Sequence, residues 1–228
     1  YKIRNPKQIE DLANYLISNI TNEYSYNSLT KVGNIKSSHT IEKYLGYLEE
    51  SFILFSLSRF SYKVKEQLAS NKKIYCIDNG FIQVKASKSS PDFGKLYENI
   101  VAIELKKLEM DGLANIYYWK NQQQEEVDFI LKQGTKIKQL IQVCYDCSNI
   151  KTKERETRSL IKASKELKCN NLIIITNDKE GEERAEWFGI KRKVNHIPLW
   201  KWLLDKNQVK LQKLEKAVKE DIKWGFKE

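Results

Sequence analysis

The sequence predicts a mixed α/β protein in two parts, a winged helix-turn-helix followed by an α-β-β-β-α-β unit with a mixed sheet. Two observations predict it. Within residues 7–78, three helical patterns precede a β-hairpin pattern, which is the element order of a winged helix-turn-helix. Beyond residue 92, one helix, three strands and a second helix precede the apolar run Leu172–Thr176, which is typical of a strand buried on both faces of a sheet.

Helical and alternating periodicities define the elements of the first part. Asn5 can cap a helix and Pro6 suits its first turn, so the first helix begins there. A lysine-rich turn joins the two β-favouring runs of the hairpin. The expected elements are helices over about Lys7–Asn19 and Asn27–Val32, a third helix that ends near Ser51, and strands over Phe52–Phe60 and Lys73–Asp78.

Asn79-Gly80 and the polar stretch Lys85–Pro91 mark the expected boundary between the parts. We therefore expect domains at residues 1–84 and 85–204, and a basic helical tail over 205–228. The second domain is expected to contain helices over Phe93–Leu108, Lys151–Lys168 and Leu199–Leu204, and strands over Ala114–Lys120, Glu126–Lys132, Lys138–Tyr145, Leu172–Thr176 and Val194–Pro198.

The composition is that of a globular protein with a basic surface. Of the 228 residues, 41% are hydrophobic, and 40 basic against 30 acidic side chains give a net charge of +10. This charge favours an acidic partner, nucleic acid first, but it is spread over both halves and locates no binding face. Since no run approaches the ~20 apolar residues that span a bilayer, we expect a cytoplasmic protein without a membrane partner.

The cysteines predict reduced thiols, as in a cytoplasm. Cys144 and Cys147 have the spacing of a redox or zinc pair, but zinc needs two more ligands. The two histidines, His39 and His196, lie far away in the sequence. We therefore expect neither metal-thiolate nor redox chemistry there.

Three polar side chains have positions suited to metal-assisted cleavage of a phosphodiester. That chemistry needs hard oxygen ligands around Mg²⁺ and usually a lysine that orients water. Glu98 lies in a helix, Asp128 lies early in the second strand, and Gln142 lies in the third, on the same face as Cys144. A carboxylate in a strand as apolar as that of Asp128 is costly unless it is paired, which indicates a functional role.

Short motifs in a fixed order resemble one protein family. They are Ile77-Asp78-Asn79-Gly80, the run Gly94 to Leu105 followed by Tyr117-Tyr118-Trp119-Lys120, Glu126-Val127-Asp128-Phe129, the run Ile141 to Asp146, Lys153-Glu154-Arg155-Glu156, and the run Ile197 to Leu204. Over about Ser25 to Leu204, the chain is similar to the C-terminal region of prokaryotic, largely archaeal, AAA+ ATPases. The resemblance implies a winged helix and a domain of the PD-(D/E)xK, restriction-endonuclease-like fold.

The resemblance also implies that ATP binds only to an N-terminal ATPase domain that this chain lacks. The chain contains no phosphate-binding loop of the G-x-x-x-x-G-K-[ST] type. It begins at Tyr1 and its single methionine is Met110, so we expect a fragment of a longer protein.

Carried across by position, the resemblance implies Mg²⁺ held by Glu98 and Asp128, with Gln142 at the (D/E) place. Cys144 stands at the lysine place, and a thiol cannot supply a fixed cation, so we expect Cys144 to be a small buried filler. Nuclease-like fold and nuclease activity are therefore separate questions. A cation from the next helix could replace the lysine, although a solvated helix face explains these residues as well: Lys151, Lys153 and Arg155.

The wing offers a surface for nucleic acid. Its basic residues have aromatic neighbours and could hold a phosphate backbone, of DNA more than RNA. The expected recognition helix carries His39 and Lys43 but also three glutamates, which weakens the case for base reading. A lysine-rich hairpin with no partner, or a protein-contact module, explains the wing as well. The expected contacts are Arg59, Lys63, Lys65, Lys72 and Lys73.

Three hypotheses follow, in order of preference. The first is a nucleic-acid-binding, catalytically degenerate nuclease-like region that works with its own ATPase domain. The second is a non-enzymatic module that contacts proteins or the ATPase core. The third is an active Mg²⁺-dependent nuclease with a relocated lysine, which a lysine or arginine nitrogen within reach of Glu98 and Asp128 would favour. Three tryptophans are expected in the core: Trp119, Trp200 and Trp202.

Overall fold

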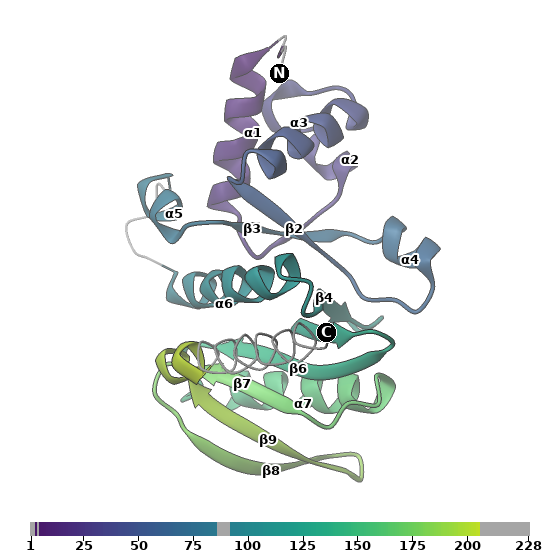
Figure 1. Ribbon diagram of the computed structural model, residues 1–228, viewed down its shortest axis with the longest axis vertical. Coiled ribbons are helices and arrows are strands. Elements are labelled where there is room, and N and C mark those ends of the chain that lie inside the picture. The colour runs from purple at the N-terminus through teal and green to yellow at the C-terminus, as the bar shows by residue number, and fades with distance from the viewer. Residues whose placement is uncertain (1–2, 4, 86–91, 206–228) are drawn as a thin grey trace, which may run out of the picture.

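The computed structural model describes residues 3, 5–85 and 92–205, which form two sheets (Figure 1). One is a three-stranded antiparallel sheet of order β1-β3-β2, and the other is a six-stranded mixed sheet of order β4-β5-β6-β7-β9-β8. The mixed α/β class is therefore confirmed. Every helix in these residues is too short or too polar to traverse a lipid bilayer.

The first sheet packs against the first helices. Three helices and a hairpin are present in the predicted order, and their apolar side chains form one core that includes Leu12, Ile41 and Ile74. A further short helix, α4 (Val64–Ala69), lies where the sequence predicted only a turn. The other elements are α1 (Pro6–Ser18), β1 (Glu23–Tyr24), α2 (Tyr26–Leu29), a 3₁₀ helix (Val32–Asn34), α3 (Ser38–Glu50), β2 (Leu54–Ser58) and β3 (Lys72–Cys76).

The second sheet has one strand more than the sequence predicted, β8 (Gly181–Trp187). Asn79-Gly80 begins a helix, α5 (Asn79–Lys85), where a break was expected. Residues 86–91 and the expected tail over 206–228 lie outside the described residues. The other elements are α6 (Phe93–Met110), β4 (Asn115–Lys120), β5 (Glu126–Gln133), β6 (Lys136–Cys144), α7 (Ile150–Glu166), β7 (Leu172–Thr176), β9 (Ile190–Pro198) and a helical segment over 199–205.

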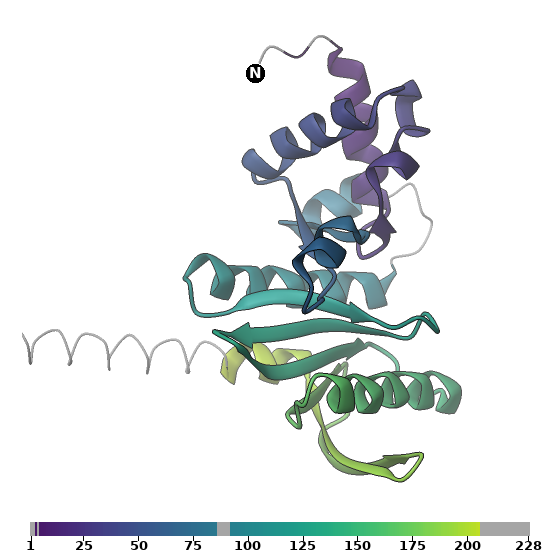
Figure 2. The same ribbon diagram turned by 90° about the vertical axis from the view of Figure 1, so that its right-hand side faces the viewer.

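Helices cover both faces of the six-stranded sheet. β6, β7 and β9 are parallel neighbours, and α7 makes the crossover from β6 to β7, so all five residues of β7 are buried. Leu105 of α6 and Trp202 belong to the core on one face, and Leu160 of α7 and Trp119 to the core on the other. The prediction for Trp200 was wrong, since 60% of its surface is exposed. Figure 2 shows the β8–β9 hairpin at the end of the sheet farthest from the first helices.

The two sheets meet along α6, which lies between them (Figure 1). Tyr75 of β3 belongs to the same core as α6 and the six-stranded sheet. Asn99 of α6 accepts a hydrogen bond from the Cys76 amide at 2.9 Å and donates one to the Cys76 carbonyl at 2.8 Å. The Phe60 amide donates to the Tyr118 carbonyl of β4 at 2.7 Å. These contacts fix β3 beside the beginnings of α6 and β5.

Candidate functional site

Three carboxylates converge where β3 faces α6 and β5. Glu98 lies in the second turn of α6, and the Asp92 side chain caps that helix by accepting a hydrogen bond from the Lys95 amide at 3.2 Å. Glu126 and Asp128 are the first and third residues of β5. The structure thus brings Glu98 and Asp128 together, and it adds Glu126, which the sequence did not single out.

Lys73 places its ammonium among these carboxylates. Its Nζ lies 2.6 Å from Glu126 Oε1, 2.9 Å from Glu98 Oε1 and 3.4 Å from Asp128 Oδ1. Only 4% of the Lys73 side chain is exposed. The prediction had placed Lys73 on the wing surface against nucleic acid. Instead the residue points inward from β3, because three buried or half-buried carboxylates face it there.

Tyr75 lies two residues farther along β3, so period-two alternation gives it the same side as Lys73. Its hydroxyl donates to Glu98 Oε1 at 2.8 Å, and the side chain is fully buried. Burial, followed by the charge of Glu98, raises the pKa of Tyr75 well above its ordinary value. The hydroxyl therefore stays protonated, and one oxygen of Glu98 accepts from both Tyr75 and Lys73.

Asp128 and Gln142 are joined by hydrogen bonds inside the sheet. Asp128 Oδ2 accepts from the Val143 amide at 2.8 Å, and the Asp128 amide donates to Gln142 Oε1 at 3.2 Å. Gln142 Nε2 in turn donates to Glu156 Oε2 of α7 at 2.7 Å. The amide group of Gln142 therefore links Asp128 to α7.

Burial and charge act in opposite directions on the buried ionisable groups. Burial lowers the pKa of Lys73, but Glu98 and the other neighbouring anions outweigh it and raise that pKa well above the ordinary value. The pKa of Asp128 is raised well above its ordinary value by burial first and by Glu98 next, with Lys73 opposing. Lys73 therefore remains an ammonium ion, and it is the cation that stabilises the surrounding carboxylates.

These residues do not fit the Mg²⁺ that the family resemblance implies. Mg²⁺ requires near-octahedral oxygen ligands at ~2.0–2.1 Å and usually keeps several waters. Here Glu98 Oε1 accepts from Tyr75 and Lys73, Asp128 Oδ1 faces the ammonium, and Gln142 Oε1 accepts from the Asp128 amide. In the part of the chain that the structure describes, no group of three or more His, Cys, Asp or Glu residues is arranged to hold a metal ion. With Lys73 in place, the predicted metal ligands hold an ammonium ion.

The cation that α7 could have supplied comes from β3. Lys153 Nζ lies 2.7 Å from Glu183 Oε1 of β8, and Arg155 Nε donates to the neighbouring Glu156 at 3.0 Å. A lysine nitrogen within hydrogen-bond distance of both Glu98 and Asp128 is present, and it belongs to Lys73.

A cavity of about 640 Å³ opens beside the carboxylates. This volume lies within the ~300–1,000 Å³ typical of ligand-binding clefts. Its lining combines Glu98, Asp128 and Gln142 with cationic side chains from the first turn of α6 and from α7, namely Lys95, Arg155 and Arg158. Two of these cations are paired with acids of the same lining, Arg158 with Glu125 at 2.8 Å and Arg155 with Glu156 at 3.0 Å.

The remaining wing residues divide by exposure. Lys63 and Lys65 are exposed at α4, and Lys63 pairs with Glu66 at 2.8 Å. Arg59 is half-buried and donates to the Lys120 carbonyl. Lys72 is half-buried and donates to the Tyr26 hydroxyl at 3.3 Å. Of the five predicted contacts, Lys63 and Lys65 have the exposure that a phosphate contact requires.

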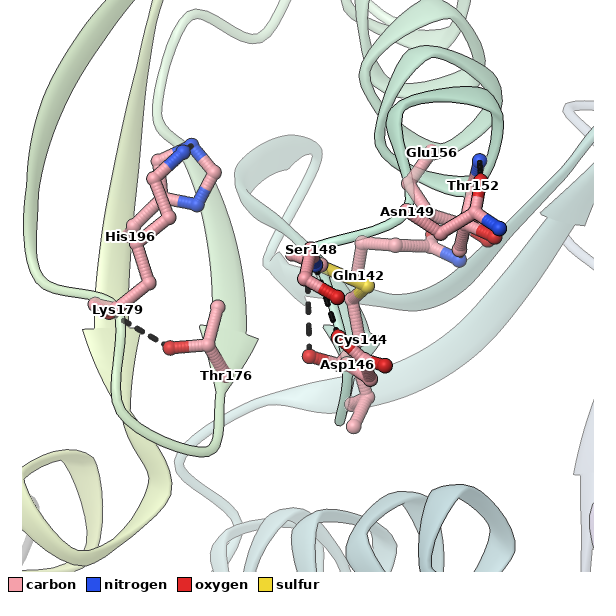
Figure 3. The surroundings of a disulfide bond; sticks show 12 residues. Gln142, Cys144, Asp146, Ser148, Asn149, Thr152, Glu156, Thr176, Lys179 and His196 are labelled. Carbon is pink, nitrogen blue, oxygen red and sulfur yellow. Dashed lines mark hydrogen bonds between the residues drawn. A yellow bond between two sulfur atoms is a disulfide. The ribbon is translucent and has the colours of Figure 1, made fainter.

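Cys144 and Cys147 form a disulfide between the end of β6 and the loop that precedes α7 (Figure 3). The prediction of reduced thiols was therefore wrong for this pair, while Cys76 and Cys169 are free and buried. Cys144 is buried, as expected of a filler, and Figure 3 shows it beside Gln142. The disulfide thus includes Cys144, the strand position that the family resemblance assigns to lysine.

Sequence reasoning missed the site roles of Lys73 and Tyr75. Their alternation places both on one face of β3, but it does not show that this face is buried against carboxylates. Glu126, at the start of β5, and Glu156, in α7, gave no signal that distinguished them from solvated acids.

Comparison with known proteins divides the chain between residues 92 and 93. Residues 1–92 match the family model described as "Domain of unknown function (DUF8612)", and residues 93–201 match "Domain of unknown function (DUF4143)". The chain contains a DUF4143 domain. Glu98, Glu126 and Asp128 lie in the DUF4143 domain, whereas Lys73 and Tyr75 lie in the preceding match. The site therefore draws on both regions.

Two curated relatives are longer than this chain. An uncharacterized protein of Methanocaldococcus jannaschii is 37% identical over 211 residues, which are 90% of this chain and 46% of that protein. An uncharacterized protein of Haemophilus influenzae is 35% identical over 79 residues, 35% of this chain and 20% of that protein. The part of each relative that this chain matches is thus less than half of that relative's length.

Proposed function

We propose that this chain is the nucleic-acid-binding, nuclease-like C-terminal region of a longer AAA+ ATPase, and that its site binds a phosphodiester without cleaving it. In this proposal the first helices and hairpin are a winged helix, and α6 with the mixed sheet is a restriction-endonuclease-like domain. The observation that carries it is the buried ammonium of Lys73, which contacts oxygens of the carboxylates that cleavage would need. The extra length of the Methanocaldococcus jannaschii relative leaves room for an ATPase domain.

Charge supports binding to nucleic acid. The chain carries a net charge of +10, and lysines that neutralise phosphates release counterions and so favour binding. Lys63 and Lys65 are exposed on the wing, and Lys95, Arg155 and Arg158 line the cavity beside the carboxylates. Duplex DNA is the proposed ligand, and the chain's own ATPase domain is the proposed protein partner.

Fluorescence anisotropy with labelled duplex DNA at several salt concentrations tests the binding. We expect the logarithm of the association constant to fall linearly with the logarithm of the salt concentration. The double variant Lys63→Glu/Lys65→Glu should bind more weakly, and the magnitude of that slope should be smaller by about two. The control is Lys191→Glu/Lys193→Glu, which makes the same change of charge at exposed lysines of β9, far from the wing. Equal losses in the two variants would sink the proposed wing contact. Absence of DNA binding at low salt would favour the protein-contact hypothesis.

A second candidate function is a metal-dependent nuclease in which Lys73 replaces the lysine missing at Cys144. The position of the Lys73 nitrogen beside Glu98 and Asp128 favours it. Incubation of the same duplex with MgCl₂ or MnCl₂ separates the two functions. We expect intact DNA. Cleavage that disappears in Asp128→Ala and in Lys73→Ala, with binding retained, would establish the second candidate instead.

A further inference from the structure

We infer that Lys73 is the resident cation of the Glu98–Glu126–Asp128 cluster, and that its ammonium, with one positive charge, lies where Mg²⁺ would be held in nucleases of the proposed fold. The cluster therefore excludes a divalent cation while Lys73 is in place. The inference rests on the proposed function for its comparison with nucleases and goes beyond it by naming the group that replaces the metal.

The donor geometry matches the acceptors. A lysine ammonium has three N–H donors and no acceptor, and three carboxylates from three different residues lie within 3.4 Å of Lys73 Nζ. Two of these distances, to Glu126 and Glu98, are those of charge-assisted hydrogen bonds. The ammonium thus uses its donors on oxygens of Glu98 and Asp128, the two residues that the family resemblance names as metal ligands.

The charges make the two cations mutually exclusive. Carboxylates that crowd together in a buried environment repel one another, so a cation among them stabilises their charged forms. Lys120 contributes from the side, 3.8 Å from Glu126 Oε2 and 2.5 Å from Glu23 Oε1. A divalent ion at the centre would have to displace Lys73 and leave a lysine that is 4% exposed without its partners, which is costly.

The Lys73 contacts also connect the two sheets. Lys73 belongs to β3, whereas Glu98 and Asp128 belong to α6 and β5. Tyr75 adds its hydrogen bond to Glu98 from the same strand. The cation of the cluster is therefore delivered by the region before the DUF4143 domain, and the cluster cannot be neutralised in the same way by the DUF4143 domain alone.

Binding of Mn²⁺ to the full 228-residue chain tests the inference. Electron paramagnetic resonance measures the concentration of free Mn²⁺. We expect wild type and Asp128→Asn to bind the same amount of Mn²⁺, because wild type has no Mn²⁺ site that depends on Asp128. Lys73→Ala removes the ammonium and leaves the carboxylates, so it should gain one site and bind Mn²⁺ at least about tenfold more tightly than wild type. Lys73→Ala/Asp128→Asn should lose that site again.

Lys120→Ala is the matched control, because it removes a lysine that also pairs with Glu126 but leaves Lys73 in place. It should gain no Mn²⁺ site. Thermal unfolding with and without MnCl₂ gives a second readout, in which Mn²⁺ raises the Tm of Lys73→Ala and leaves that of Lys120→Ala unchanged. If Lys73→Ala does not fold, Lys73→Gln, which keeps a donor without the charge, takes its place in both measurements.

An Asp128-dependent Mn²⁺ site in wild type would overturn the inference, as would a folded Lys73→Ala or Lys73→Gln variant without a new site. The Mn²⁺ measurements test the inference about Lys73, and the DNA measurements test the proposed function, so either idea can be refuted without the other. Absence of DNA binding with the expected Mn²⁺ results would sink the proposed function and leave Lys73 as the resident cation. DNA binding with an Mn²⁺ site in wild type would do the reverse.

Discussion

Tyr75→Phe isolates a single hydrogen bond in the charged cluster. The Tyr75 ring packs against Phe55 and Phe129 at centroid distances of 5.6 and 5.8 Å, and phenylalanine preserves that packing. The substitution removes only the hydroxyl, which donates to Glu98 Oε1 at 2.8 Å. Any loss of stability therefore reports on the hydroxyl and its carboxylate partner.

The expected loss follows from the charge of the acceptor. A hydrogen bond to a charged group contributes about 1.5–3 kcal/mol, against about 0.5–1.5 kcal/mol for a neutral pair. Tyr118 provides the matched control, because it is also fully buried and its hydroxyl donates to a neutral carbonyl, that of Asn71, at 2.6 Å. Tyr75→Phe should therefore cost about 1 kcal/mol more than Tyr118→Phe.

Urea denaturation of wild type and both variants measures this difference. With unchanged m-values, the shift of each midpoint gives the change in the free energy of unfolding. A cost for Tyr75→Phe equal to or below that for Tyr118→Phe would refute a charged Glu98 bonded to Tyr75.

Three further predictions concern other contacts. Asn99→Ala should lower the free energy of unfolding in urea by about 2–5 kcal/mol, because it leaves the buried amide and carbonyl of Cys76 unpaired. Asn171→Ala is the control: it removes one exposed hydrogen bond to the Lys138 carbonyl and should cost less than about 1 kcal/mol. Burial, followed by the charge of Lys179, lowers the pKa of His196. The neutral histidine therefore contributes stability above the ordinary histidine pKa of about 6.5, and this contribution is lost as the pH falls through the lower folded pKa. The difference in unfolding free energy between wild type and His196→Asn should shrink over that range, and a constant difference would contradict the neutral histidine. Alkylation of unfolded, unreduced protein should label Cys76 and Cys169 alone, and labelling of Cys144 or Cys147 would contradict the disulfide. Because the disulfide closes a short loop, its reduction should lower the free energy of unfolding by about 2 kcal/mol.

Elements with a strong apolar pattern were predictable, and elements that depend on their partners were not. β7 is buried along its whole length, and its predicted bounds, Leu172–Thr176, were correct. β8 is an edge strand rich in charged residues, and only Ala185 and Trp187 are apolar on the side that faces the core and α7, so its alternating pattern is weak. Asn79-Gly80 has the composition of a turn, but α5 begins there.

A polar partner for Asp128 was predictable and the burial of Lys73 was not, although both ionisable residues are buried in strands. Asp128 stands inside an apolar run, where a carboxylate needs a partner. Lys73 follows a lysine-rich turn and looked like one more exposed cation. Its burial depends on Glu98 and Asp128, which lie 25 and 55 residues farther along the chain. No local pattern encodes that separation.

The charges of the two regions complement each other in both directions. Lys73 of β3 enters a carboxylate cluster of the DUF4143 domain, and Lys120 of β4 in that domain reaches back to Glu23 of β1. Glu126 lies between the two lysines and contacts both. The DUF4143 domain alone would keep the cluster carboxylates and lose the buried cation that neutralises them. We therefore expect metal binding by this domain to depend on the residue that the preceding region supplies at position 73, as well as on its own carboxylates.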